Sequence, residues 1–159
     1  MALARMSPTF SRNISPGAAQ GRVLYVEDED ANWKITERYL RGKFELKRAR
    51  SSSEALSLVG TQSFDLLLLD IELAGSELDG LGLCRVFRGT APPPQGFRRP
   101  GWLTEAVPIV FVTAYTARYP REELLRLGAN EVVTKPVDYT RLLLVSSRLI
   151  VSGLHGPAT

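Results

Sequence analysis

The feature that most constrains this chain is a run of four leucines that ends on an acid. In the segment FDLLLLDIELAG, residues 64–75, the last of these leucines is followed directly by Asp70. A continuous apolar run of this length, bounded by polar residues, indicates a strand buried on both faces, as in a parallel sheet covered by helices. Because open α/β sheets bind ligands beyond the carboxyl ends of their strands, Asp70 is expected where a site would lie.

The rest of the sequence repeats the same alternation of apolar and amphipathic segments. The strand-like segments are RVLYVEDED, FELKRA, FDLLLLD, VPIVFVTA and EVVTKP. Helical patterns follow each of them, in DANWKITERYLRGK, SSSEALSLVG, DGLGLCRVFRG, REELLRLGA and DYTRLLLVSSRLIVSGL. Five strand–helix units predict an α/β fold, a parallel sheet with right-handed crossovers and helices on both faces. In the first helix, Ile35, Tyr39 and Leu40 are expected to share one apolar face.

Length and composition predict one folded domain. The chain has 159 residues, of which 44% are hydrophobic and 23% charged, and we expect the domain to span residues 21–154 between tails at 1–20 and 155–159. No apolar run approaches the about 20 residues that cross a bilayer, and no secretory signal is evident. The single cysteine, Cys84, excludes an internal disulfide framework. We therefore expect a cytoplasmic protein without a membrane partner.

The net charge of +3 does not indicate nucleic-acid binding. Arg5, Arg12 and Arg22 are the only charged residues before position 23, and without them the 20 basic residues fall to 17, equal to the 17 acids. The predicted domain is thus close to neutral, and a uniform basic face is missing from the pattern. We expect no direct nucleic-acid partner.

Polar residues of the kinds that bind metals or phosphoryl groups lie at the ends of four predicted strands. Glu27 and Asp28 end the first, Asp70 the third and Thr113 the fourth, and Lys135 ends the fifth. Parallel strands end at one edge of a sheet, where three carboxylates repel one another unless a cation lies among them. Oxygen ligands suit Mg²⁺, and a lysine and a hydroxyl beside it suit a phosphoryl group. Each residue alone is as often a cap or a surface charge as a functional group, but five at successive strand ends argue against coincidence.

Four of these segments together resemble a known family. VLYVEDE, FDLLLLDIEL, VPIVFVTA and VVTKP are similar to the signature segments of two-component response regulator receiver domains. The resemblance runs from residue 22 to about residue 153, apart from the proline-rich segment 90–106. It implies a flavodoxin-like (βα)₅ fold with a doubly wound parallel sheet of five strands in the order 2-1-3-4-5.

The resemblance also assigns roles. Asp70 matches the phospho-accepting aspartate, Thr113 the switch hydroxyl, and Lys135 the lysine that precedes a cis-proline, here Pro136. By the same resemblance, Mg²⁺ is the cofactor, and its ligands are Glu27, Asp28, Asp70 and the backbone carbonyl of Glu72.

The sequence departs from the family pattern around this site. Ala74 stands where the family usually has proline, and the pair Asp79-Gly80 comes two residues later than usual. The loop after the third strand is therefore expected to be longer and looser. Val132 replaces an aromatic residue, so a ring-driven switch cannot operate. Tyr115 is expected to border the path of hydrolytic water.

These observations predict a stand-alone response regulator that signals by protein contacts. It would not be an enzyme acting on a separate substrate, but a phosphoacceptor that catalyses its own phosphorylation and dephosphorylation. Its expected partners are a sensor histidine kinase or a histidine phosphotransfer protein, and a downstream protein target. Two alternatives stay open. One is a pseudo-receiver scaffold, favoured by Val132, and the other is a small-molecule phosphatase with an aspartate nucleophile, although no cap domain is evident.

Two surfaces are expected to contact other proteins. In the last helix Leu142, Leu149 and Ile150 form one apolar face, whereas Leu144 and Val151 lie on another. The second face predicts a homodimer through this helix, with cover by the N-terminal tail as an equal alternative.

The inserted proline-rich loop is the other expected surface. Residues 90–106 contain Phe97 and Trp102 beside Arg98 and Arg99. Exposed aromatics next to arginines are typical of binding hot spots. The pattern predicts a partner contact here and no catalytic role.

Overall fold

The computed structural model describes residues 21–114 and 118–155. The strands are β1 (Arg22–Val26), β2 (Glu45–Ala49), β3 (Leu66–Leu69), β4 (Ile109–Thr113) and β5 (Glu131–Thr134). The helices are α1 (Asp30–Leu40), α2 (Ser52–Thr61), α3 (Gly80–Arg88), α4 (Arg121–Arg126) and α5 (Tyr139–His155). No helix among these residues has the length and apolar character that crossing a membrane requires.

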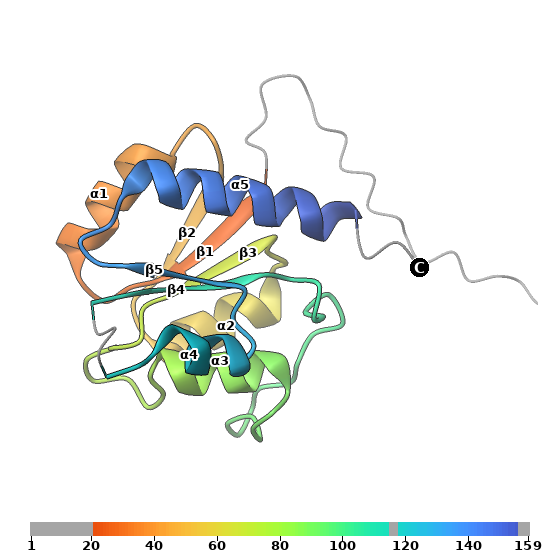
Figure 1. Ribbon diagram of the computed structural model, residues 1–159. Helices are drawn as coiled ribbons and strands as arrows, with labels where there is room; N and C mark the ends of the chain where they lie inside the picture. Colours follow the sequence, from red (N-terminus) through yellow and green to blue (C-terminus); the bar gives the residue numbers. More distant parts are fainter. Residues whose placement is uncertain (1–20, 115–117, 156–159) are drawn as a thin grey trace, which may run out of the picture.

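The strands form one parallel sheet in the order β2-β1-β3-β4-β5, which confirms the predicted flavodoxin-like topology. Helices α1 and α5 cover one face of the sheet, and α2, α3 and α4 cover the other (Figure 1). The polar strand β2 lies at an edge, as its sequence suggests, and β3 lies in the centre. Each strand pairs in parallel with its neighbour, so all five carboxyl ends meet at the same edge.

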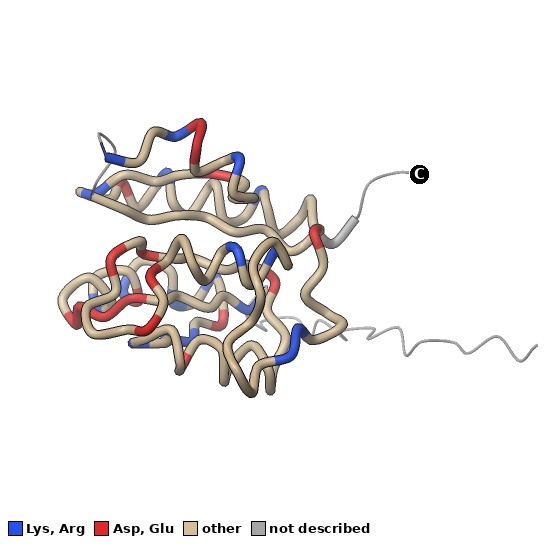
Figure 2. The backbone as a smooth tube through the Cα atoms, turned by 90° about the horizontal axis from the view of Figure 1, so that it is seen from below, with Lys and Arg blue, Asp and Glu red and all other residues tan. Residues whose placement is uncertain are grey.

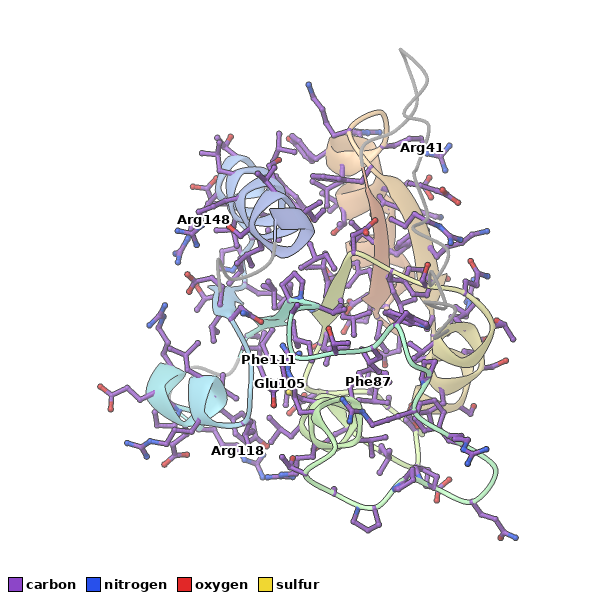
Figure 3. All side chains as sticks on the ribbon, turned by 90° about the vertical axis from the view of Figure 1, so that its right-hand side faces the viewer. Arg41, Phe87, Glu105, Phe111, Arg118 and Arg148 are labelled. Atoms are coloured by element: carbon purple, nitrogen blue, oxygen red, sulfur yellow. The ribbon has the colours of Figure 1, made fainter. Side chains whose placement is uncertain are left out.

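The leucine run of β3 serves two cores at once. Leu67 and Leu69 belong to the cluster under α2 and α3, whereas Leu66 and Leu68 belong to the cluster under α1 and α5. Side chains alternate across a strand, so a central strand needs an apolar residue at every position. Figure 3 shows Phe87 of α3 and Phe111 of β4 in the interior on the α3 side, and neither side chain has exposed surface.

Cys84 of α3 is a core residue. Its side chain is fully buried and its Sγ lies 3.6 Å from the carbonyl oxygen of Leu127, to which the thiol donates. Burial raises the pKa of the Cys84 thiol to about 11. The thiol is therefore protonated at neutral pH and is a poor nucleophile.

The predicted apolar face of α1 is wrong for two of its three residues. Ile35 is 46% exposed and Tyr39 is 56% exposed, whereas Thr36 and Leu40 are buried. The two pairs have the same spacing of four, so periodicity alone could not choose between them. Thr36 can be buried because its hydroxyl donates to the backbone carbonyl of Asn32 at 2.9 Å.

The connection from α3 to β4, residues 90–106, contains no helix or strand, as predicted. The prediction that its aromatic residues are exposed is wrong. Trp102 is partly buried, its Nε1 donates to the carbonyl of Val59 at 3.2 Å, and its ring meets Phe64 edge-on. Phe97 packs against Phe87 in the same way. Both rings therefore hold the loop to the domain.

Trp102→Ala is therefore expected to lower the free energy of unfolding by about 2–3 kcal/mol. The change removes apolar contact and leaves the buried carbonyl of Val59 without its donor. Urea unfolding measures the effect. Arg98→Ala, an exposed change in the same loop, is the control and is expected to stay within about 0.5 kcal/mol of wild type. Equal stability of both variants would mean that Trp102 does not anchor the loop.

Candidate functional site

Acidic residues gather at the edge where the strands end (red, left in Figure 2). Glu27 and Asp28 follow β1, and Asp70 follows β3. One carboxylate oxygen from each of the three lies within 4.8 Å of the other two. Glu27 is fully buried, Asp70 is almost so, and Asp28 is half-buried. The pairing of β1 with β3 creates this arrangement, because it aligns the ends of two strands that both terminate in acids.

Lys135 lies among these carboxylates. It follows β5 and precedes Pro136 through a cis peptide bond. Its Nζ is 3.0 Å from Asp70 Oδ2 and 3.4 Å from both carboxylate oxygens of Glu27. Burial alone would lower the pKa of Lys135, but Asp70 and Glu27 raise it above its ordinary value. The ammonium group is therefore charged and partly balances the acids.

The carboxyl group of Glu27 is strongly perturbed. Burial, together with the nearby Asp70, raises the pKa of Glu27 to about 8. Asn32, on the first turn of α1, donates to Glu27 Oε1 at 2.7 Å and to Glu29 Oε2 at 3.0 Å. Asn32 is not among the residues predicted from the sequence to form the site. Its position in the first turn of the helix that follows the first acidic strand end is the sequence feature that indicates its proximity to Glu27.

The loop between β3 and α3 is not loose, contrary to the prediction. The backbone N–H of Ala74 donates to Asp28 Oδ2 at 3.1 Å. Further along the loop, Ser76 Oγ accepts from the backbone of Ser52, and Ser52 Oγ accepts from the backbone of Leu78, both at 3.2 Å. Ser76 and Leu78 are therefore held against α2, and this part of the loop does not extend freely into solvent.

Two further predicted residues, Thr113 and Glu72, contact Lys135 and Asp70 through their backbones. Thr113 is fully buried at the end of β4, and its carbonyl accepts from the backbone N–H of Lys135 at 2.8 Å. Val132 is buried in the core under α2 and α3 and provides no ring. The backbone N–H of Glu72 lies 3.3 Å from Asp70 Oδ1, to which it donates. Tyr115 lies outside the described residues.

A pocket of about 580 Å³ opens over the carboxylates. Its lining consists of Asp28, Glu29, Asn32, Asp70, Glu72, Leu73, Ala74, Ala114 and Lys135. Three clustered carboxylates beside an open pocket fit a hard divalent cation, which takes oxygen ligands and keeps several waters. Within the described residues these three acids are the ones placed to hold a metal ion. The donor set therefore fits Mg²⁺.

Comparison with known proteins agrees with this geometry. A family model described as the response regulator receiver domain matches residues 23–146. The chain is 30% identical over 121 residues to the transcriptional regulatory protein ZraR of Escherichia coli. This match covers 76% of this chain and 24% of ZraR. It is 30% identical over 118 residues to the response regulator PleD of Caulobacter vibrioides, covering 74% of this chain and 23% of PleD. The chain thus spans about a quarter of the length of these relatives.

A solved structure has a similar fold and a metal at the corresponding kind of site. The receiver domain of the sensor histidine kinase PA1611 from Pseudomonas aeruginosa was solved with a magnesium ion coordinated in its active-site cleft. It is 27% identical, has a TM-score of 0.69, and the match covers 84% of this chain and all of that one. The fold, the acidic pocket and the match over residues 23–146 lead to one conclusion. This chain belongs to the response regulator receiver domain family.

Proposed function

We propose that this chain accepts a phosphoryl group on Asp70 in a magnesium-dependent reaction and signals through protein contacts. The phosphoryl donor would be a phosphohistidine of a sensor histidine kinase or of a histidine phosphotransfer protein. The observation that carries the proposal is the position of Asp70, whose Oδ2 is 3.0 Å from Lys135 Nζ within the cluster of three carboxylates. A cytoplasmic location belongs to the same proposal.

The chemistry follows from the residues around Asp70. A carboxylate oxygen of Asp70 attacks phosphorus, the bond from phosphorus to the histidine nitrogen breaks, and the electron pair leaves with the imidazole. Mg²⁺, held by Glu27, Asp28, Asp70 and the backbone carbonyl of Glu72, would supply positive charge to the phosphoryl oxygens. Lys135 would exchange its contact with Asp70 Oδ2 for a phosphoryl oxygen.

Thr113 is proposed to donate its hydroxyl to the phosphoryl group, a role that the family resemblance assigns to it. It ends β4, next to the strand end that carries Lys135, since Thr113 pairs with Thr134. Because Val132 has no ring to move, we infer that any movement of Thr113 is passed on without an aromatic switch on β5.

Intact mass after incubation with acetyl phosphate and Mg²⁺ tests the proposal. We expect the mass of one phosphoryl group to appear with Mg²⁺ and not with EDTA. A chain that gains no mass would be a scaffold of this fold, the pseudo-receiver alternative. Steady release of phosphate from a generic phosphate ester would instead indicate a small-molecule phosphatase.

The outer face of α5 supports a proposed homodimer. Leu144 is 65% exposed and Val151 is 54% exposed, and both lie on the same side of the helix. A two-fold contact would bury this apolar surface in both subunits. Arg148, four residues after Leu144 and three before Val151, lies between them on this face. Its Nη2 is 3.7 Å from Glu131 Oε2 of β5, so its charge is partly balanced within the subunit.

Leu144→Glu combined with Val151→Glu is expected to convert a dimer at micromolar concentration into a monomer. Burying two new carboxylates in each subunit is costly, by several kcal/mol for each dimer. Sedimentation velocity measures the change. Ile35→Glu, at an exposed apolar position of α1, is the matched control and is expected to remain dimeric. A monomeric wild type, with or without phosphodonor, would contradict the homodimer.

A further inference from the structure

The loop from β3 to α3 links one carboxylate of the acidic cluster to α2. On one side, the backbone N–H of Ala74 donates to Asp28 Oδ2 at 3.1 Å. Both residues also line the pocket, so the hydrogen bond lies at the site itself. A backbone donor to a carboxylate holds that side chain in one orientation and leaves its other lone pairs available.

The other side of the loop is fastened to the first residue of α2. Ser52 is almost fully buried, its backbone N–H donates to Ser76 Oγ, and its own Oγ accepts from the backbone N–H of Leu78. Both distances are 3.2 Å. We call these two hydrogen bonds the serine clasp. Ser76 in turn donates its backbone N–H to the carbonyl of Leu73, the residue before Ala74.

The clasp and the Ala74 hydrogen bond form one continuous connection. Ser52 fixes Ser76, the turn from Ser76 to Leu73 fixes the backbone at Ala74, and that backbone fixes Asp28. Because the Ala74 donor is a backbone amide, a side-chain change at position 74 keeps it, whereas proline has no N–H to offer.

We propose that the Ala74 N–H is a positioning group for the metal ligand Asp28, and that the serine clasp sets the affinity of the site for a divalent cation. The inference rests on the proposed function in one respect, namely that the three carboxylates bind Mg²⁺. It adds that residues of α2, outside the pocket, control this binding. Groups that orient ligating carboxylates by hydrogen bonds typically change metal affinity by about 10–100-fold when they are removed.

Calorimetric titration of the metal-free full chain with MgCl₂ tests the inference. Ser76→Ala removes the acceptor of the Ser52 backbone N–H, the hydrogen bond that leads to Ala74, and is expected to raise the Mg²⁺ Kd about tenfold. Ser51→Ala is the matched control. Ser51 Oγ accepts from the backbone of Glu54 at 3.2 Å and caps the same helix, but forms no bond to the loop between β3 and α3. It is expected to weaken α2 and leave the Kd unchanged.

A second pair of variants tests the backbone N–H of residue 74 by itself. Ala74→Pro removes the N–H and is expected to raise the Kd at least as much as Ser76→Ala, whereas Ala74→Gly keeps the N–H and is expected to bind Mg²⁺ like wild type. Thermal melts show which variants are folded before each titration, and Ser76→Ala provides the answer if Ala74→Pro does not fold.

The outcomes separate the inference from the proposed function. A wild type that binds no Mg²⁺ would overturn both the metal site and the clasp. A wild type that binds Mg²⁺, with Ser76→Ala and Ser51→Ala both matching its Kd, would overturn the clasp alone. An equal rise in Kd for both serine variants would also overturn it, because the effect would then come from the stability of α2.

Discussion

Asp70→Asn is expected to abolish covalent phosphorylation completely while the fold is retained. The amide has nearly the same shape as the carboxylate, but it lacks the negative oxygen that attacks phosphorus. Among the three clustered carboxylates, Asp70 both lines the pocket and contacts Lys135 Nζ, at 3.0 Å, so the variant removes the acid best placed to meet a phosphoryl group. Intact mass after incubation with acetyl phosphate and Mg²⁺ gives the readout, and circular dichroism checks the fold.

Glu77→Gln is the matched control for this experiment. Glu77 is an exposed acid in the loop between β3 and α3, so the change removes the same charge near the site without touching the acidic cluster. We expect this variant to gain the same mass as wild type. If Asp70→Asn is labelled as fully as Glu77→Gln, Asp70 is not the acceptor.

The metal-free protein is expected to lose stability as the pH rises through the range set by Glu27. Its pKa is about 8 in the fold, against an ordinary value of 4.5, because burial and Asp70 disfavour the charged form. Between these two values the folded state holds a proton that the unfolded chain releases. The contribution of Glu27 is therefore fully present below pH 4.5 and is lost as the pH rises to about 8. At about 1.4 kcal/mol for each pH unit, the loss over this window of about 3.5 units is on the order of 5 kcal/mol.

Urea unfolding of wild type and Glu27→Gln at several pH values measures this contribution. Glutamine does not titrate, so the variant is expected to lack the decline, and the difference between the two curves isolates Glu27 from other groups. The proposed Mg²⁺ site exists only in the folded state, so Mg²⁺ is expected to raise the melting temperature of wild type, most clearly near pH 8. Two results together would contradict a buried acidic metal site. One is a free energy of unfolding that depends on pH in the same way in wild type and Glu27→Gln, and the other is a melting temperature that Mg²⁺ does not change.

The sequence was sufficient for the architecture because each strand and helix carries a strong local pattern. The leucines of β3 are apolar at every position, which identifies a central strand, and β2 alternates and lies at the edge. The convergence of Glu27, Asp28, Asp70 and Lys135 follows from parallel topology alone, since it requires only that strand ends meet. These parts of the prediction needed no knowledge of side-chain contacts.

What the sequence did not reveal depends on contacts between distant segments. Asn32 reaches Glu27 because α1 begins close to the end of β1, and the Ala74 amide reaches Asp28 through a loop whose course no periodicity describes. Trp102 looked like an exposed contact residue because its partners, Val59 and Phe64, lie about forty residues earlier in the chain. In α1, the buried Thr36 was missed because its hydroxyl is satisfied within the helix.

The burial of Cys84 has a practical consequence for solution studies. It is the single cysteine of the chain, and with a pKa of about 11 and no exposed surface it is expected to resist thiol-reactive dyes and spin labels at neutral pH. A cysteine introduced at an exposed position such as Glu77 would then be the one reactive thiol in the folded protein. Site-specific labelling near the pocket is accordingly feasible without first removing a native thiol.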